Sequence, residues 1–413
     1  MDSVSQQRLI SAEPETRMMR FFSRLRASDL YHPLIAFLVS RFVIFFGGYI
    51  GELAIPGVDG DGFYHVAPDN LFVDIWSRWD SAFYISIVEQ GYSFVPEQVS
   101  NVAFFPLYPL LTAIVSLVTP SVYVAGIVVS HLMFFGALVF LYKLAAHEFD
   151  ADTARRAVFY IAVFPTSFFF SAFYTESTFL FMSVTAIYFA RRRLWVWAAL
   201  FAMLTTISRI VGLGIWGVVG LEWLAAQGWT LSTIYRRDAW QNLWQGLRAN
   251  WHELLVICLS PLGLVSHMVF LSRTVQDPIA FWSVQSAWGR EDIGFVRIIL
   301  RDTIPLFSQN FGTGDIWWHV IFDVGSLFLA LILSVQIWRQ LGEGMAIYTV
   351  IAMLIPANSG AGSLMRYIVV LFPVFIIFGR WGRRDSVDRA MIIGFTLFLG
   401  IFTTIFVNWI FVA

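Results

Sequence analysis

The sequence predicts an all-α polytopic membrane protein, and three observations support this fold class. Only 13% of the 413 residues are charged and 58% are hydrophobic, whereas a soluble globular protein carries about 25% charged residues. Apolar segments of about 20 residues, the length that a helix needs to cross a bilayer, recur along the chain. The 17 tryptophans suit side chains that lie at the level of the lipid headgroups. We therefore predict one membrane domain, 1–413, with about 11 transmembrane helices.

Each predicted span should be helical, because backbone polar groups find no water in the hydrocarbon core. In chain order the spans are 33–54, 122–146, 156–172, 175–190, 195–209, 211–226, 253–272, 317–338, 343–357, 366–379 and 389–411. The single cysteine, Cys258, excludes a disulfide framework and a Cys-based metal site. The net charge of -1 gives no indication of a nucleic-acid partner.

Arginine positions predict the orientation, because cytosolic loops carry an excess of Lys and Arg. Five arginines lie in the segment 1–32, which we expect to be a cytosolic tail. The segment 55–121 carries many acidic residues against Arg78 alone and is expected to be the first external loop. Within it, 104–118 is short and apolar, and we expect a helix at the external membrane surface. The second predicted external loop is 273–316.

The tripeptide Arg78-Trp79-Asp80 lies in the first external loop. Asp80 is flanked by aromatic residues, among them Trp79 and Tyr84, and a carboxylate that is partly shielded from water is a better proton acceptor. The alternative is that Asp80 is the N-cap of a surface helix that begins near Ser81. The two roles are compatible.

Glu176 and Arg209 are predicted at the external ends of neighbouring spans. Ionisable groups near membrane depth usually face a cavity or a partner. The positive-inside tendency disfavours an external arginine, so a bound anion would explain Arg209, whose guanidinium can hold a phosphate with two N–H groups. The alternative for Glu176 is a helix cap. The alternatives for Arg209 are a side chain that snorkels to the membrane surface and an ion pair with Glu176 or Asp80.

A glycine-rich turn, from Pro356 to Tyr367, is also predicted to be external. Backbone N–H groups in such a turn can approach an anion closely. With Arg366 and Tyr367 beside it, the turn is a second candidate for binding phosphate. A plain flexible turn is the alternative.

The histidines show no metal-ligand spacing. His65 lies near three aspartates, but a solvated loop is a stronger interpretation than a cation site. There is no Walker-type loop and no dinucleotide-binding glycine motif in the sequence. An external aspartate, external arginines and a lipid-exposed body favour a lipid-phosphate substrate. We expect no cofactor, and the sequence leaves the presence of a divalent metal ion open.

Five motifs, in this order, resemble the PIG-V family, which is related to the second mannosyltransferase of GPI-anchor synthesis and has the GT-C architecture. The resemblance extends from about residue 30 to 380. The motifs are Arg78-Trp79-Asp80 with Gly91-Tyr92, the segment 101–109, the segment 164–177, Ser208-Arg209-Ile210-Val211-Gly212, and Met365-Arg366-Tyr367 with Phe372-Pro373. No longer insert typical of the eukaryotic GPI enzyme is seen, which favours a prokaryotic member.

The resemblance implies a GT-C-type fold with juxtamembrane helices on its external face, and an inverting glycosyltransferase. Its donor would be a polyprenyl- or dolichyl-phosphate sugar, usually mannose, with a lipid, glycan or protein acceptor that stays open. The family's base maps onto Asp80, and Arg209, Arg366 and Tyr367 are expected to bind the donor phosphate. The residues expected to contact substrate or orient the loop are Arg78, Trp79, Tyr84, Tyr108, Glu176 and Trp288. We expect the plasma membrane of a prokaryote, or the ER membrane of a eukaryote, with an external or lumenal site.

Two other classes stay open on the sequence. A multi-span lipid or sugar transporter or flippase would also have many spans and intramembrane charges, but no inverted repeat is visible. An inactive scaffold subunit is the other class, and the intact Trp79-Asp80 setting argues mildly against it.

Overall fold

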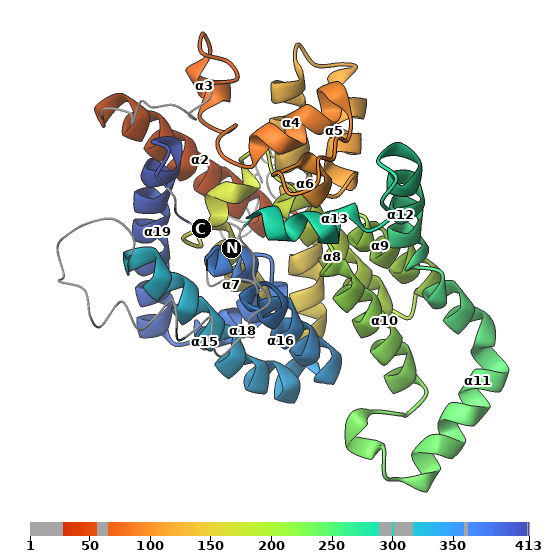
Figure 1. The fold of residues 1–413 in the computed structure, drawn as a ribbon. Coiled ribbons are helices and arrows are strands. Elements are labelled where there is room, and N and C mark those ends of the chain that lie inside the picture. The colour runs from red at the N-terminus through yellow and green to blue at the C-terminus, as the bar shows by residue number, and fades with distance from the viewer. Residues whose placement is uncertain are drawn as a thin grey trace, which may run out of the picture.

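The computed structural model describes residues 28–55, 65–288, 300, 317–358, 362–410 and 412, and these residues form helices and connecting segments without a strand (Figure 1). The α-helices are α2 (Tyr31–Ala54), α3 (Leu71–Asp74), α4 (Ser81–Gln90), α5 (Leu107–Ser116), α6 (Val122–Glu148), α7 (Ala151–Ala162), α8 (Glu176–Arg191), α9 (Trp195–Thr206), α10 (Gly212–Ala226), α11 (Arg237–Cys258), α12 (Leu262–Thr274), α13 (Ala280–Ser283), α15 (Trp317–Leu341), α16 (Glu343–Ala357), α17 (Leu364–Ile368), α18 (Phe372–Trp381) and α19 (Asp385–Val407). Four 3-10 helices join them: η1 (Asn101–Ala103), η2 (Ser167–Phe170), η3 (Leu231–Thr233) and η4 (Val284–Trp288). The predicted all-α class is confirmed.

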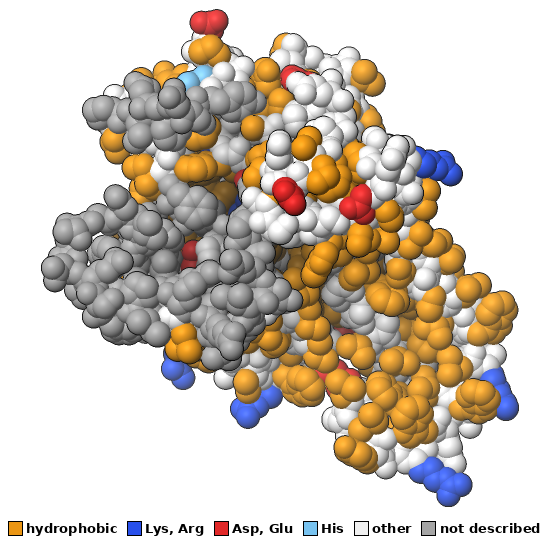
Figure 2. Space-filling view, in the orientation of Figure 1, with side chains coloured by type: hydrophobic (Ala, Val, Ile, Leu, Met, Phe, Trp, Pro, Cys, Tyr) orange, Lys and Arg blue, Asp and Glu red, His pale blue; other side chains and the backbone are white. Residues whose placement is uncertain are grey.

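Among the described residues, 5 helical stretches are long and apolar enough to cross a membrane: Tyr31–Ala54, Val122–Glu148, Arg237–Thr274, Ile321–Leu341 and Asp385–Val407. Their outer faces carry large exposed apolar side chains, such as Phe42 (70% exposed), Ile332 (66%) and Ile393 (67%). Such faces would be unfavourable in water and are suited to lipid. Figure 2 shows hydrophobic side chains over much of the visible flank, with Lys and Arg at its lower and right-hand edges.

Two predicted spans, 156–172 and 366–379, are wrong as continuous helices. The first is interrupted because α7 ends at Ala162, before Pro165, and the chain then turns through η2. The second is divided into α17 and α18, and Pro373 occupies the first turn of α18. In both cases the interruption places an irregular segment beside polar side chains. The apolar composition of the two segments did not indicate these interruptions.

The core of the bundle surrounds α18, whose residues from Phe372 to Gly379 are all buried. A helix that is apolar on every side belongs in the interior, and α18 packs against α7 and α15. Helices α6 and α8 pack closely along each other in the same core. The short helices α3, α4 and α5 lie together at one end of this bundle, the upper end in Figure 1. The predicted surface helix at 104–118 corresponds to α5, which is only 10 residues long.

Candidate functional site

Four charged side chains from distant segments form one group of ion pairs, here called the charged cluster: Asp80, Glu176, Arg209 and Arg366. Arg366 Nη1 lies 2.5 Å from Asp80 Oδ2, and Arg366 Nε pairs with Glu176 Oε1. Arg209 Nη1 is 2.9 Å from the same Glu176 oxygen. Glu176 is therefore shared by both arginines, whereas Asp80 contacts Arg366. The fold brings together the predicted base and the two predicted phosphate-binding arginines.

The members of the charged cluster differ in their access to solvent. The side chain of Glu176 is 0% exposed, those of Arg366 and Arg209 are 11% and 13% exposed, and that of Asp80 is 27% exposed. Two carboxylates and two guanidinium groups balance in charge, which lowers the cost of holding them away from water. Asp80 is the carboxylate of this cluster that an incoming molecule can reach most easily.

Aromatic rings hold both guanidinium groups in place. The Arg366 guanidinium lies 4.5 Å from the centre of the Tyr174 ring and 5.2 Å from that of Phe169. The Arg209 guanidinium lies 4.9 Å from the Tyr367 ring. Planar guanidinium groups stack favourably on aromatic faces, so these rings fix the direction in which each N–H group points.

Asp80 occupies the N-cap position of α4, but its side chain makes no capping hydrogen bond. The carboxylate pairs with Arg366 instead, so the predicted cap role is wrong. The Asp80 backbone N–H donates to the Tyr174 hydroxyl at 3.2 Å, and that hydroxyl donates to the Arg78 carbonyl at 3.1 Å. Trp79 has a φ of 56°, a left-handed conformation that is rare for a bulky residue. The backbone is thus held in an unfavourable shape next to the acidic group.

The turn that carries Arg209 depends on the glycine of the predicted motif. The Arg209 N–H donates to the Thr205 carbonyl at 3.1 Å, where α9 ends. A Cβ on Gly212 would lie 2.2 Å from that carbonyl oxygen, so only glycine permits α10 to begin here. Ser208 and Thr175 share a hydrogen bond of 3.2 Å, which joins the Arg209 turn to the segment before Glu176.

Asp323 on α15 supports the Arg366 arm and was missed by the sequence analysis. Its carboxylate accepts hydrogen bonds from the Ser363 and Met365 N–H groups at 3.2 and 2.8 Å. These two N–H groups of the glycine-rich turn are therefore bonded to Asp323, and the predicted contact of the turn's backbone with an anion stays a prediction. An ionisable residue inside an apolar segment is the signal that could have identified Asp323, as it did for Arg209.

Arg78 belongs to a different group of ion pairs. Its side chain is 0% exposed, lies 2.9 Å from Asp74 and 3.1 Å from Glu52, and neighbours His65 at 3.0 Å. This arrangement anchors the loop to α2 rather than offering a group to a ligand. Among the described residues, no set of three His, Cys, Asp or Glu side chains could hold a metal ion.

The other predicted contact residues lie at different depths. Tyr84 and Tyr108 are buried between α4, α5 and α6, and the Tyr108 hydroxyl donates to the Gly126 carbonyl at 2.9 Å. Burial raises the pKa of Tyr84 well above its ordinary value, so its hydroxyl stays protonated. Trp79 is half-buried against Trp409. The side chain of Trp288 lies outside the described residues.

The long apolar helices identify the chain as a membrane protein, and the charged cluster at one end of the bundle is its candidate polar site. The model of a family described as mannosyltransferase (PIG-V) matches residues 61–265. The match covers just under half of the chain, and over this part the chain is similar to the PIG-V family, in agreement with the resemblance seen in the sequence. The matched segment contains Asp80, Glu176 and Arg209 and ends before Arg366.

Solved structures with a similar arrangement of helices are longer than this chain. The apo oligosaccharyltransferase of Archaeoglobus fulgidus has a TM-score of 0.47 and 15% identity, and the match covers 94% of this chain and 56% of that one. The oligosaccharyltransferase AglB of the same organism, in complex with an inhibitory peptide and a dolichol-phosphate, has a TM-score of 0.43 and 13% identity, with 92% and 55% covered. The chain thus spans about half the length of the solved structures it matches. No curated protein matches the chain significantly.

Proposed function

We propose that this chain is a GT-C-type glycosyltransferase that transfers a sugar, most simply mannose, from a polyprenyl- or dolichyl-phosphate donor. The observation that carries this proposal is the charged cluster, in which a reachable carboxylate, Asp80, lies against an arginine, Arg366. Such a pair provides both groups that the reaction needs, a proton acceptor and a cation for a leaving phosphate. The PIG-V-like sequence around Asp80, Glu176 and Arg209 supports the choice of mannose.

Donor binding would rearrange the ion pairs of the cluster. A phosphate oxygen competes with Asp80 for the Nη1 group of Arg366, because guanidinium binds phosphate and carboxylate through the same N–H groups. Glu176 is fully buried and would keep both arginines in position. Asp80, released from Arg366, would then be free to accept a proton. In this scheme the carboxylate becomes a base only when the donor is present.

The chemical step is a single displacement. Asp80 accepts the proton of an acceptor hydroxyl. At the same time the oxygen of that hydroxyl forms a bond to the anomeric carbon of the sugar. The bond from that carbon to the phosphate oxygen breaks, and the electron pair leaves on the lipid phosphate, with inversion at the sugar. Arg366 and Arg209 stabilise the negative charge that grows on this oxygen. No metal ion takes part in this scheme.

The remaining predicted residues receive supporting roles. Tyr367 lies under Arg209 and would orient it toward the phosphate. Trp79 is half-exposed and would stack on the sugar, with Trp288 as a second aromatic candidate. Arg78, Tyr84 and Tyr108 are buried and would position the loop that carries Asp80. The arginine-rich opposite end of the bundle supports a site on the external or lumenal face, and we propose a prokaryotic plasma membrane or an ER membrane.

Transfer in detergent tests the proposal. Purified protein would be given polyprenyl-phosphate mannose with a labelled sugar, and membrane lipids of the host cell as acceptors. We expect Asp80→Asn to lose transfer by at least a hundredfold while polyprenyl phosphate still binds, because the amide cannot accept the proton. Glu89→Gln is the matched control, since Glu89 is an exposed acid on the same helix, α4, away from the cluster. Normal transfer by Asp80→Asn would disprove the base. Absence of transfer by the wild type, together with lipid translocation in vesicles, would favour the flippase alternative.

A further inference from the structure

The first half of α11 and the residue that follows its kink expose three tryptophans, here called the tryptophan row, that the proposed reaction does not use. Trp240, Trp244 and Trp251 are 49%, 57% and 61% exposed. Trp240 and Trp244 lie one turn apart on the same face of the helix, and Trp251 follows directly after the non-helical Asn250. Large aromatic side chains with an N–H group are favoured where one end is apolar and the other is wet.

The rest of this half-helix is arranged around that row. Ala239, Leu243 and Gly246 are buried and face the protein, and a Cβ on Gly246 would lie 2.3 Å from the Gln227 side chain. The side away from the protein carries the exposed Gln241, Asn242, Gln245 and Arg248. Trp240 and Trp244 therefore lie between the face that packs on the protein and the exposed polar face. Tryptophans beside a polar face suit the headgroup level of a membrane.

Two arginines on this half-helix have no carboxylate partner among the described residues. Arg236 pairs with Asp238 at 2.6 Å, but no ion pair is formed by Arg237 or Arg248 within those residues. The Arg248 guanidinium lies 5.0 Å from the centre of the Trp244 ring. If the Trp244 ring lies at the level of the lipid headgroups, the guanidinium beside it can bind a lipid phosphate.

A kink separates this half-helix from the apolar half that follows. Asn250 has φ and ψ of -124° and 25°, which are not helical values. The chain before it is polar or amphipathic, and the chain after it is mostly apolar through α12, as a membrane-crossing segment requires. The segment 237–249 is about 20 Å long at 1.5 Å per residue, enough to follow the surface over several lipids.

The position of this half-helix in the bundle is also defined. The Glu343 carboxylate accepts from the Leu231 N–H of η3, just before α11, at 2.7 Å. Arg191 at the end of α8 pairs with Glu222 on α10 at 3.2 Å. The start of α11 thus lies at the end of the bundle where α8 ends, and Glu176 begins α8 at the other end. Figure 1 shows α11 starting at the lower edge, far from α4.

We propose that residues 237–249 form an interfacial helix that binds anionic phospholipid on the membrane face opposite the charged cluster. The tryptophan row lies among the headgroups, and Arg237 and Arg248 hold lipid phosphates. Charge complementarity selects the occupant, since these two arginines lack carboxylate partners among the described residues. This surface does not depend on the proposed reaction.

Spin labels on the intact protein test the depth of the helix. In a Cys258→Ser background, Trp244→Cys and Gln245→Cys variants would be labelled and reconstituted in phosphatidylcholine vesicles with or without 30% phosphatidylglycerol. We expect the label at 244 to be accessible to oxygen, and the label at 245 to be accessible to a water-soluble relaxation agent. A label at 244 that meets water, or one that is shielded from both agents by a protein partner or second copy, would overturn the proposal.

Lipid titration tests the arginines. Phosphatidylglycerol in detergent should bind the wild type with an affinity that falls roughly 30-fold in Arg237→Gln/Arg248→Gln, the factor expected for two arginines at an anionic surface. Arg192→Gln/Arg193→Gln is the matched control, since it removes two exposed arginines from the same end of the bundle and should keep the wild-type affinity. Equal loss in both variants, or no preference of the wild type over phosphatidylcholine, would contradict the assignment.

Discussion

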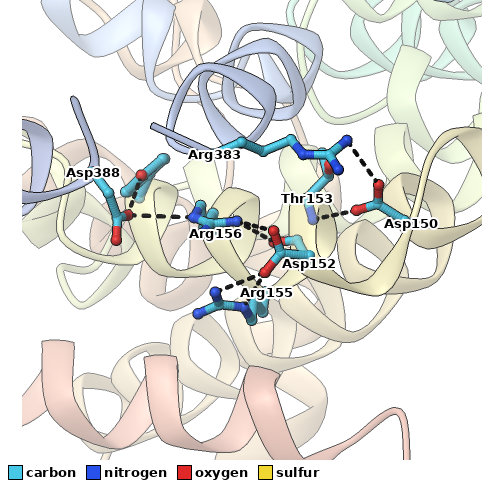
Figure 3. A network of polar contacts seen from close by, with 8 residues as sticks. Asp150, Asp152, Thr153, Arg155, Arg156, Arg383 and Asp388 are labelled. Carbon is cyan, nitrogen blue, oxygen red and sulfur yellow. Dashed lines mark hydrogen bonds and ion pairs between the residues drawn. The ribbon is translucent and has the colours of Figure 1, made fainter. Parts of the chain in front are cut away.

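The bundle carries an arginine–carboxylate network at each end, and the two differ in burial. The charged cluster joins Asp80, Glu176, Arg209 and Arg366, with Glu176 fully buried. The opposite network, called the far-end network and drawn in Figure 3, consists of Asp150, Asp152, Arg155, Arg156, Arg383 and Asp388. Its Arg155 and Asp152 are 44% and 43% exposed.

The far-end network combines local and long-range pairs. Asp152 pairs with Arg155 and Arg156, three and four residues away on α7, whereas Arg383 pairs with Asp150, 233 residues away. In the charged cluster, Arg366 is 286 residues from Asp80 and 190 from Glu176. Local exposed pairs stabilise a helix slightly, whereas buried pairs between distant segments cost desolvation energy and persist where the arrangement has another use. An arginine-rich sequence alone therefore does not identify a site.

Removing the shared carboxylate should have the largest effect. Glu176→Gln removes the carboxylate that pairs with Arg209 and Arg366, so we expect the free energy of unfolding to fall by roughly 3–5 kcal/mol. Melting temperature in detergent is the measurement. Asp152→Asn at the far end is the control and should cost below about 1 kcal/mol, because exposed pairs contribute little. Equal losses in the two variants would remove the distinction between the two ends.

Much of the fold could be predicted from periodic apolar composition. The spans at 33–54 and 122–146 correspond closely to α2 and α6, because long apolar runs permit only helices in lipid. The broken segments at η2 and between α17 and α18 were not predicted, since their apolar residues are buried against other helices rather than lipid. Composition cannot distinguish those two environments.

The sequence identified the residues of the candidate site better than it predicted the contacts between them. Asp80, Glu176, Arg209 and Arg366 each stood out as a charge in an apolar setting. An ion pair of Arg209 with Glu176 was one of the stated alternatives and is observed, but the sequence did not indicate that Arg366 joins Glu176 to Asp80. Arg78 was predicted to orient the loop or to contact substrate, and its ion pairs with Asp74 and Glu52 are consistent with the first of these two roles. Arg41, which is buried, was not singled out from the sequence. Its guanidinium donates to the Ser171 hydroxyl at 2.7 Å and so holds the segment before Glu176.

At the far end, loss of the cap on α7 should have a moderate effect. The Asp150 carboxylate accepts from the Thr153 N–H at 2.7 Å, so Asp150→Ala should lower the free energy of unfolding by about 1 kcal/mol. Transfer activity at permissive temperature should be unchanged, because this network is remote from the charged cluster. Asp150→Asn, which can still cap, should recover most of the stability. A large loss of transfer in Asp150→Ala without unfolding would mean that the two ends are coupled.

Acid should weaken the far-end network by a smaller amount. Hydrogen bonding from the Thr153 N–H lowers the pKa of Asp150, and hydrogen bonding from Arg156 lowers the pKa of Asp152. Because both values are lower in the folded protein, the stabilisation is present above the unfolded pKa of about 3.9 and disappears as the pH falls through the folded values. Melting temperatures between pH 3 and pH 7 should therefore decline less steeply below pH 4 in Asp150→Asn/Asp152→Asn than in the wild type. Parallel curves would show that these pairs contribute nothing.

The smallest expected effect concerns the backbone beside Arg366. Ser363 has a φ of 71°, which costs a residue with a Cβ about 1 kcal/mol, and glycine adopts this conformation without that cost. Because glycine also loses more entropy on folding, Ser363→Gly should change the free energy of unfolding by only a few tenths of a kcal/mol in either direction. Ser363→Val should destabilise by about 1–2 kcal/mol, since a branched side chain tolerates this conformation poorly. The Asp323 carboxylate accepts from the backbone of both variants, so donor affinity should follow the backbone and not the lost hydroxyl. If Ser363→Gly lost donor affinity as strongly as Ser363→Val, the Ser363 hydroxyl itself would be needed for donor binding. The site would then include this hydroxyl in addition to the four residues of the charged cluster.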